Sequence, residues 1–447
     1  MEQTGLDYGK GKIGALFRKI FFPTLFGMIF TALITIADGV FVGNKVGPDG
    51  IAAVNIIAPI WMVATGIGLM LGIGASVVAG MALANNDNDR ANRVVSQSFM
   101  CGTFIMLLIE LFALIFPRTV AMILGCSDHL LPLALDYLCW LMPGLLFLSW
   151  GCIGMMIIRL DGSPKYAMMC NVIPAILNVV GDYVLIYPCN MGIKGAAIAT
   201  GGSVIVGGLM AIFYFRWSYV LKLKPGFQGF GRNVLRVSAI GSSAFVTEIA
   251  MSIMMITGNV VFMQYYGDAG VAAYSIACYL FPIMFMMSNA VAQSAQPIIS
   301  YNYGTNAIDR VAGAFIISLR VALLCGVIAC AGIVLGSKWL VEMFIPITTT
   351  AGQLAVKGLP IFSICAVFFA LNIAYIGYYQ SIGKAMRAIS LTLLRGVILL
   401  VPLFFVLPAI FPQWGMWAAI PAAELLTFMI IILTGSKLTK HSARTLH

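Results

Sequence analysis

The chain has 447 residues, of which 61% are hydrophobic and only 9% are charged, and its formal net charge is +10. A soluble domain does not need so much apolar surface to fill its core, and no stretch is polar enough to form a separate soluble domain. The composition therefore predicts one integral membrane protein. It argues against a nucleic-acid partner because the basic residues are distributed by loop.

Apolar stretches of about 20 residues or more, the length that crosses a bilayer, recur along the whole chain. We expect an all-α polytopic membrane protein with twelve spans, at residues 20–43, 51–83, 94–116, 131–158, 166–187, 193–215, 237–265, 271–300, 312–335, 354–381, 388–410 and 415–434. The first is predicted to be a retained span, because its apolar run is too long for a signal peptide and lacks a small-residue cleavage pattern. The ten cysteines show no paired spacing, which indicates packing residues.

The lysine and arginine residues indicate the orientation. If the N-terminus is cytoplasmic, 21 of the 26 lie in inner segments, counting Arg320 and Arg395 with the nearest inner loop. The outer segments hold the other five, Lys45, Arg118, Lys194, Lys338 and Lys357. The positive-inside rule therefore predicts that both termini are cytoplasmic.

Two pairs of similar segments indicate an internal duplication. GPDGIAAVNIIAP at 47–59 resembles GDAGVAAYSIACY at 267–279, and RLDGSPKYAM at 159–168 resembles QSIGKAMRAI at 380–389 more faintly. Both offsets are about 220 residues. The alternative is that the matches reflect similar loop chemistry.

The longest polar linker, residues 217–236, lies near the middle of the chain. It divides the chain into an N-terminal six-helix lobe at 1–216 and a C-terminal six-helix lobe at 237–447. Because six helices return the chain to its starting side, we expect the lobes to be related by a pseudo-two-fold axis along the membrane normal. Two lobes that face a central cavity suit transport by alternating access.

Carboxylates within the spans are the strongest indication of function, because a charge at the bilayer centre costs about 3 kcal/mol on insertion scales. Asp38 and Asp182 each lie about five residues before the outer end of a span, or about 8 Å below the surface. Asn178 shares a helix face with Asp182, and Thr200 reaches a similar depth. We interpret these four residues as one cation-coupling site, in which oxygen ligands suit either H⁺ or Na⁺.

Three further residues lie inside spans. Pro23, fifteen residues before Asp38, frees a backbone carbonyl and bends a helix; we predict a conformational hinge there, with ordinary packing as the alternative. Glu110 is typical of a hydrogen-bonded structural group. Glu424 is embedded in the last span.

Glu248, near the midplane of the seventh span, is predicted to contact a cation or the substrate. Methionines cluster nearby in MSIMMI at 251–256 and PIMFMM at 282–287. Methionine is flexible and polarizable, and it suits surfaces that accept varied apolar partners. We therefore expect a substrate or second cation site beside Glu248, with ordinary packing as the alternative, formed by Met254, Met255, Met284 and Phe285.

Several motifs are absent from the sequence. There is no G-x-x-x-x-G-K-[ST] nucleotide loop, and neither H-E-x-x-H nor G-x-S-x-G occurs. The sequence thus predicts no ATPase or hydrolase of its own, no cofactor, and no metal beyond Na⁺ as a possible coupling ion. Energy must come from an ion gradient or from the gradient of the solute.

The chain resembles multidrug and toxic compound extrusion (MATE) transporters over nearly its whole length. The resemblance rests on the first span with Pro23 and Asp38, on FVGNKVGPDGIAAVN, RLDGSPK, LNVVGDYVLIY and GIKGAAIAT, and on AQPIISYNYG and GMWAAIPAAE in the second half. It is greatest to the bacterial branch that includes staphylococcal-type multidrug exporters.

This resemblance implies that Tyr137 joins Asp38, Asn178, Asp182 and Thr200 in the cation-coupling site. It also implies that Glu248 corresponds to a seventh-helix glutamate that some members use for cation or drug binding. The chain differs from the family at two places. Met155 and Met156 stand where relatives often have an asparagine, and Glu424 stands where an aspartate is common.

We therefore expect a monomeric antiporter of the cytoplasmic membrane of a prokaryote. It would export amphipathic or cationic organic compounds in exchange for H⁺ or Na⁺. One alternative is a flippase for lipid-linked precursors, which a basic cavity would favour, but only Arg320 and Arg395 are basic residues at depth. A membrane-embedded enzyme or receptor is a remote alternative, because neither a reactive constellation nor a signalling domain is visible.

Overall fold

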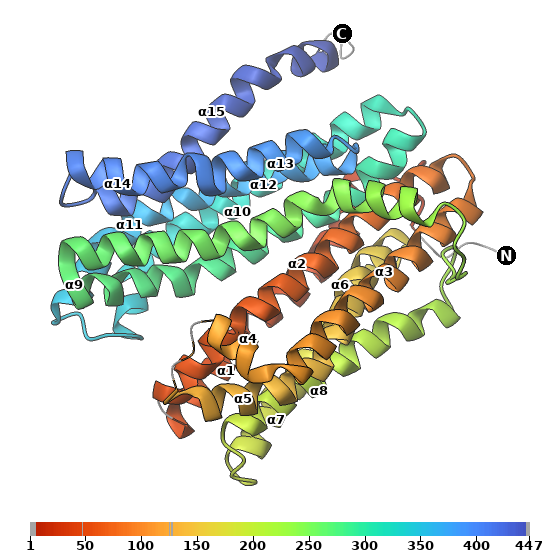
Figure 1. Ribbon diagram of the computed structural model, residues 1–447. Coiled ribbons are helices and arrows are strands. Elements are labelled where there is room, and N and C mark those ends of the chain that lie inside the picture. Colours follow the sequence, from red (N-terminus) through yellow and green to blue (C-terminus); the bar gives the residue numbers. More distant parts are fainter. Residues whose placement is uncertain (1–5, 47, 125, 127, 444–447) are drawn as a thin grey trace. The chain divides into compact units, whose positions relative to one another are not determined.

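The computed structural model describes residues 6–46, 48–124, 126 and 128–443. Throughout this part the regular structure is helical, and no strand occurs in it. The chain forms two compact units (Figure 1). The first comprises Met1–Phe245 with Ser300–Thr305, and the second comprises Val246–Ile299 with Asn306–His447.

Twelve helices in the described part are long and apolar enough to cross a membrane, which confirms the predicted number of spans. They are Ile13–Ala32, Ala53–Ala84, Asn88–Ile115, Leu131–Leu160, Pro164–Ile186, Ile193–Arg216, Phe230–Gly267, Ala269–Gly304, Ile308–Glu342, Thr350–Ser381, Ala385–Ile410 and Gly415–Thr434. Each overlaps one predicted span.

The first unit is built around helices that pack in neighbouring pairs, α7 against α1 and α8, and α2 against α3 and α6. Its helices are α1 (Ile13–Lys45), α2 (Pro48–Ala84), α3 (Asn88–Ile115), α4 (Pro117–Ile123), α5 (Leu131–Leu141), η1 (Met142–Gly144), α6 (Leu145–Leu160), α7 (Pro164–Ile186), α8 (Ile193–Phe213) and η2 (Tyr214–Arg216).

In the second unit α10 packs against α12, and α14 packs against α15. Most of α9 (Phe230–Gly304) belongs to this unit. Its other helices are α10 (Ile308–Glu342), α11 (Thr350–Ser363), α12 (Cys365–Ser381), α13 (Ala385–Leu393), the π-helical turn η3 (Leu394–Ile398), α14 (Leu400–Ile410) and α15 (Gly415–Ala443).

Helix α9 contains two spans that meet at Gly267. This residue has φ 58° and ψ −149°, a conformation that glycine adopts readily and other residues do not. The chain therefore changes direction at Gly267, between the seventh and eighth spans.

The segment predicted as a linker, residues 217–236, lies entirely within the first unit. Asp161, the acidic residue of the RLDG motif, holds its beginning. The Asp161 carboxylate accepts hydrogen bonds from the backbone N–H groups of Tyr219 at 2.7 Å, Val220 at 2.9 Å and Leu221 at 2.8 Å. It also accepts one from the Tyr214 hydroxyl at 2.7 Å. The motif residue is therefore a structural anchor.

Polar side chains of α3 hold the next part of the linker. Asn92 Oδ1 accepts from the backbone N–H of residue 222 at 2.8 Å, and Ser96 Oγ accepts from that of residue 224 at 2.7 Å. Gln97 Nε2 donates to the carbonyl groups of residues 226 and 228 at 2.8 and 3.0 Å. Because packing units need not coincide with the repeated lobes, the expected lobe boundaries stay a prediction.

Helix α2 and the beginning of α9 make backbone contact in the first unit. A Cβ atom at Gly241 would lie 1.9 Å from the Met70 carbonyl oxygen, and one at Gly74 would lie 2.0 Å from the Val237 carbonyl oxygen. Small residues allow membrane helices to approach this closely. The contact fixes the beginning of the seventh span against the second.

Candidate functional site

Four helices of the first unit carry the five residues predicted to form the cation-coupling site. Asp38 lies on α1, Tyr137 on α5, Asn178 and Asp182 on α7, and Thr200 on α8. Because α7 packs against both α1 and α8, and α5 also packs against α8, these helices can present their side chains to one place.

Small residues set the distance between α7 and α8. A Cβ atom at Gly181 would lie 3.0 Å from the Ala199 Cβ, and one at Gly195 would lie 3.0 Å from the carbonyl carbon of Leu185. No larger side chain fits at these contacts without a shift. The close packing brings Asn178 Nδ2 to 3.1 Å from Thr200 Oγ1, to which it donates a hydrogen bond.

The carboxyl groups of Asp38 and Asp182 lie within hydrogen-bonding reach of each other. Asp182 is fully buried. No N–H or O–H group of the described residues donates to either of its oxygens, or to Oδ1 of Asp38. Since ionised carboxylates only accept hydrogen bonds, a hydrogen bond between these two groups requires a proton on one of them.

Tyr137 completes the cluster. Its side chain is buried, its hydroxyl hydrogen-bonds the Thr200 side chain, and it lies close enough to interact electrostatically with both Asp38 and Asp182. Tyr137 belongs to the same hydrophobic core as Val42 and Ile186. The structure therefore brings all five predicted residues together. Their role in coupling stays a prediction.

The cluster has too few ligands of the usual kinds for a transition-metal site. Among the described residues no group of three or more His, Cys, Asp and Glu side chains is placed to hold a metal ion. Two carboxylates with amide and hydroxyl oxygens are hard ligands. These oxygen atoms suit a proton or a small hard cation.

Pro23 lies inside α1, which is assigned as one helix over its full length. It is half-buried, and the neighbouring Thr24 is buried. A hinge at Pro23 stays a prediction.

The residues predicted for a second site lie in the second unit. Glu248, on α9, is half-buried and forms no ion pair with any residue that the structure describes. Met254, Met284 and Phe285 are buried in the hydrophobic core of this unit, and Met255 packs against that core. In this arrangement the four side chains contribute to ordinary packing. A cavity beside them stays a prediction.

A buried charged cluster in the second unit was missed by sequence reasoning. Arg395 Nε lies 3.4 Å from Glu424 Oε1, and both side chains are about 95% buried. Asn372 Nδ2 donates to Glu424 Oε2 at 2.7 Å and to the Glu424 carbonyl oxygen at 2.9 Å. The guanidinium also lies 4.4 Å from the centre of the Phe369 ring. These contacts tie η3 and α12 to α15.

Arg395 lies inside the eleventh span, as expected of a basic residue at depth, although the charge count included it with the nearest inner loop. It lies in the π-helical turn η3 inside the eleventh span, a local form that is frequent at functional sites. Opposite charges embedded in consecutive spans were the pattern that could have revealed the pair. Arg320, the other basic residue at depth, is exposed on α10.

Glu110 has the structural role expected of it. Its Oε1 accepts a hydrogen bond at 2.6 Å from the backbone N–H of Leu146, at the beginning of α6. A carboxylate is favourable there because the first N–H groups of a helix lack partners within it.

Comparisons with known proteins agree over most of the chain. A family model described as MatE matches residues 23–184 and 243–406. The two matches begin 220 residues apart, the offset seen in the internal duplication.

Two relatives are multidrug export proteins named MepA. That of Staphylococcus aureus (strain MRSA252) is 26% identical over 430 residues, which cover 93% of each chain. That of Staphylococcus saprophyticus is 24% identical over 445 residues, which cover 95% of this chain and 94% of the relative. A solved structure described as an outward-facing conformation of a multidrug resistance MATE family transporter of the MOP superfamily has a TM-score of 0.91, 22% identity and 99% coverage of both chains.

Proposed function

Because the chain belongs to the MatE family, whose members are multidrug efflux transporters and not enzymes, we propose that it is a secondary active antiporter. It exports amphipathic, cationic organic compounds in exchange for protons by alternating access. The observation that carries this proposal is the Asp38–Asp182 pair, two neighbouring carboxyl groups in an apolar core with no other donor to Asp182 among the described residues.

The Asp38–Asp182 pair can couple the movement of two cations because its ionised state is energetically unfavourable. Two ionised carboxylates side by side in an apolar core repel each other and lack solvation. A proton on the pair relieves this cost, and so does an organic cation nearby. Since either neutralises the same charge, each disfavours binding of the other, which is the requirement for exchange.

In the proposed cycle the pair takes up a proton from the outer side, where Asp38 and Asp182 are expected to lie about 8 Å below the surface at 1.5 Å per residue. Protonation weakens the attraction for the bound cation, and the substrate leaves outward. The proton is released inward after the transporter changes conformation. Asn178 and Tyr137 both hydrogen-bond Thr200, and in this proposal the three residues form the polar side of the site beside the two carboxyl groups.

Na⁺ is the second candidate for the coupling ion. The hydroxyl and amide oxygens beside the carboxylates are hard ligands of the kind that Na⁺ also accepts. We favour the proton because the contact between Asp38 and Asp182 needs one to become a hydrogen bond.

A flippase for anionic precursors is less well supported. Arg395 is neutralised by Glu424, and Arg320 is exposed on α10, so neither provides an unpaired buried charge for a phosphate. The relatives named above are multidrug exporters.

We also place the transporter, as a monomer, in the cytoplasmic membrane of a prokaryote with both termini inside. The excess of lysine and arginine in the inner segments supports this orientation. The excess remains when Arg395 is left out of the count. The monomer is proposed because one chain supplies every residue of the cluster.

The test is dye efflux from vesicles containing the purified protein, driven separately by an imposed pH gradient and by an imposed Na⁺ gradient. We expect the pH gradient to drive efflux. Asp38→Asn and Asp182→Asn should reduce it to the level of empty vesicles. Asp136→Asn is the matched control, because Asp136 is a half-buried acidic residue of the same unit that pairs with Lys194 at 3.3 Å.

Full-rate export by correctly inserted Asp38→Asn and Asp182→Asn proteins would contradict the proposed coupling site. Efflux driven only by the Na⁺ gradient would identify Na⁺, and not the proton, as the coupling ion. Loss of transport under both gradients in the unmodified protein would reject antiport.

A further inference from the structure

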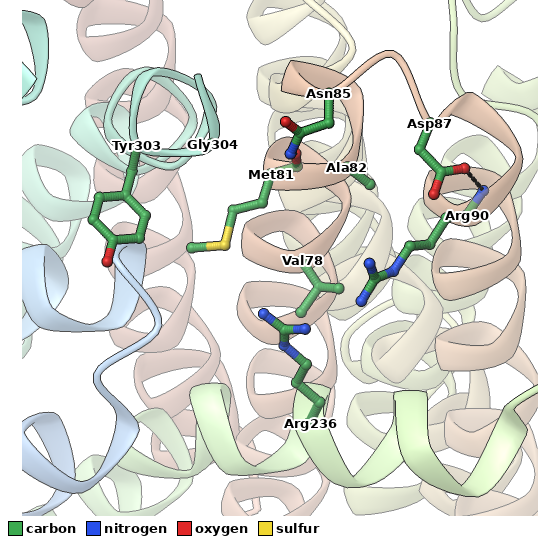
Figure 2. Close-up of a pocket in the computed structure, with 9 residues that line it drawn as sticks. All are labelled: Val78, Met81, Ala82, Asn85, Asp87, Arg90, Arg236, Tyr303 and Gly304. Atoms are coloured by element: carbon green, nitrogen blue, oxygen red, sulfur yellow. Dashed lines mark hydrogen bonds between the residues drawn. The ribbon is translucent and has the colours of Figure 1, made fainter. Parts of the chain in front are cut away.

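A small pocket lies in the first unit, away from the carboxyl pair. Its volume is about 210 Å³. It lies between the end of α2, the beginning of α3, and the two ends of α9 that belong to this unit (Figure 2). The approach is close, since a Cβ atom at Gly304 would lie 2.6 Å from the Ala84 Cβ. The pocket thus joins the ends of four spans.

Two arginines give this pocket its character. Arg90 of α3 and Arg236 of α9 both line it, and their guanidinium groups extend towards the same space beside Val78 (Figure 2). Within the described part of the chain, neither guanidinium forms an ion pair or a hydrogen bond. Two cationic side chains therefore converge there without an ion pair to either of them among the described residues.

The remaining polar groups of the pocket are few. Asp87 is its one carboxylate among the lining residues, and Asp87 Oδ1 accepts a hydrogen bond from the backbone N–H of residue 90 at 3.0 Å. Asn85 Nδ2 donates to the carbonyl oxygen of Met81 at 2.9 Å. The Tyr303 side chain also lines the pocket. Two arginines against one carboxylate leave a net charge of +1.

The volume and the net charge of the pocket indicate the class of ligand that it can bind. The volume is below the roughly 300–1,000 Å³ of pockets that enclose drug-sized molecules, so the substrate of an exporter does not fit. A compact anion with one negative charge does. Arginine is the side chain best suited to phosphate, because its planar fork donates two parallel hydrogen bonds.

We propose that this pocket binds a singly charged phosphate group, presented by the headgroup of an anionic phospholipid or as inorganic phosphate. With the orientation given above, the pocket faces the cytoplasmic leaflet. Basic pockets between spans on that side bind anionic headgroups, and each arginine near the surface contributes to the attraction. A phosphodiester headgroup would neutralise the charge of the pocket.

A bound phosphate would join elements that are distant in the sequence. Arg90 follows the second span, whereas Arg236 lies near the beginning of the seventh. A ligand held by both would stabilise the packing of these helix ends against each other. Alternating access requires the ends of such spans to separate at some stage, so bound phosphate would favour the state in which they are packed.

The experiment measures binding to the purified full-length protein in a neutral detergent. The probes are dioctanoyl phosphatidylglycerol, dioctanoyl phosphatidylcholine as the zwitterionic control, and inorganic phosphate. The variants are Arg90→Gln, Arg236→Gln and the double change. Matched controls are Arg93→Gln and Arg232→Gln, which remove the same charge from the same two helices outside the pocket.

We expect each pocket variant to weaken phosphatidylglycerol binding about fivefold, and the double change about 25-fold. The control variants should change it less than about twofold. Arg236→Lys, which keeps a charge but loses the fork, should bind more weakly than the wild type and more tightly than Arg236→Gln. Because Arg236 is exposed, its variants should fold even if Arg90→Gln does not.

Arginine-dependent binding of phosphatidylglycerol alone assigns the ligand to the lipid. Arginine-dependent binding of inorganic phosphate with comparable affinity assigns it to free phosphate. The proposal is overturned if neither probe depends on Arg90 and Arg236, or if the control arginines matter equally. None of these results depends on transport, so they are separate from the test of antiport.

Discussion

Replacing Asp161 by alanine is expected to detach the beginning of the linker from the first unit. The carboxylate accepts four hydrogen bonds at 2.7–2.9 Å, three of them from consecutive backbone N–H groups. A hydrogen bond to a charged group contributes about 1.5–3 kcal/mol, so simple addition would give at least about 6 kcal/mol. The net loss is smaller, because some of the donors find other partners.

The structure shows which donors these are. Tyr214 keeps a hydrogen bond to Ser163 Oγ at 2.8 Å, and Tyr219 is exposed, so its N–H can bond to water. Leu221 is fully buried, and its N–H would lose its partner. We therefore expect the change to reduce the free energy of unfolding by roughly 3–5 kcal/mol.

Limited trypsin digestion is the direct assay, because Lys222 and Lys224 lie in the attached segment. A loss of about 3 kcal/mol raises the open population more than 100-fold, at about 1.4 kcal/mol for each factor of ten. The rate of cleavage follows that population when opening is fast. Thermal unfolding of the same purified protein should show the loss independently.

Asp89→Asn is the matched control for Asp161→Ala. Asp89 is an exposed carboxylate that pairs with Lys224 of the same segment at 3.2 Å, and such surface pairs contribute about 0–1 kcal/mol. If the two variants were cleaved at similar rates and melted together, our account of the RLDG motif would be wrong.

Three further predictions test other parts of the structure. Glu424→Gln leaves Arg395 buried without a counter-charge and should reduce the free energy of unfolding by roughly 3–5 kcal/mol. The double change Glu424→Leu with Arg395→Met replaces both charges by apolar side chains and should restore thermal stability. Equal stability of the single and double variants would refute this account. Cys189, exposed between the fifth and sixth spans, should react with a membrane-impermeant maleimide on intact cells, and reaction only in inverted vesicles would reverse the orientation. Gly241→Val should lower the thermal midpoint because its Cβ meets a carbonyl oxygen of α2 at 1.9 Å, while Gly231→Val, with no atom within 4 Å, should not.

The spans and the carboxyl cluster were accessible from the sequence because local patterns determine them. Hydropathy over about 20 residues identifies a span whatever its neighbours are. Asp38 and Asp182 were found because each is anomalous in its own segment, and their similar depth follows from the helical rise. Tyr137 carries no such anomaly, since an aromatic residue in an apolar span is ordinary; only the resemblance to a family indicated it.

The remaining features depend on which faces meet, and the sequence does not determine that locally. Arg395 and Glu424 lie 29 residues apart on different helices, and whether they pair depends on the rotation of each helix about its axis. The segment 217–236 is polar, and its composition predicted a linker between two lobes without indicating what holds it. Its partners Asn92 and Gln97 lie about 130 residues earlier in the chain, beyond the reach of any local pattern.

The attachment of this segment has a consequence for dividing the protein experimentally. A polar stretch between two repeats is an attractive place to cut a gene or to insert a tag, and exposed loops usually tolerate such changes. Here an inserted domain would displace backbone groups that satisfy buried side chains of α3. The two compact units divide at residue 245, inside α9 and beyond the linker. Half-transporters produced as separate chains should therefore assemble better if the first fragment retains the whole of 217–236.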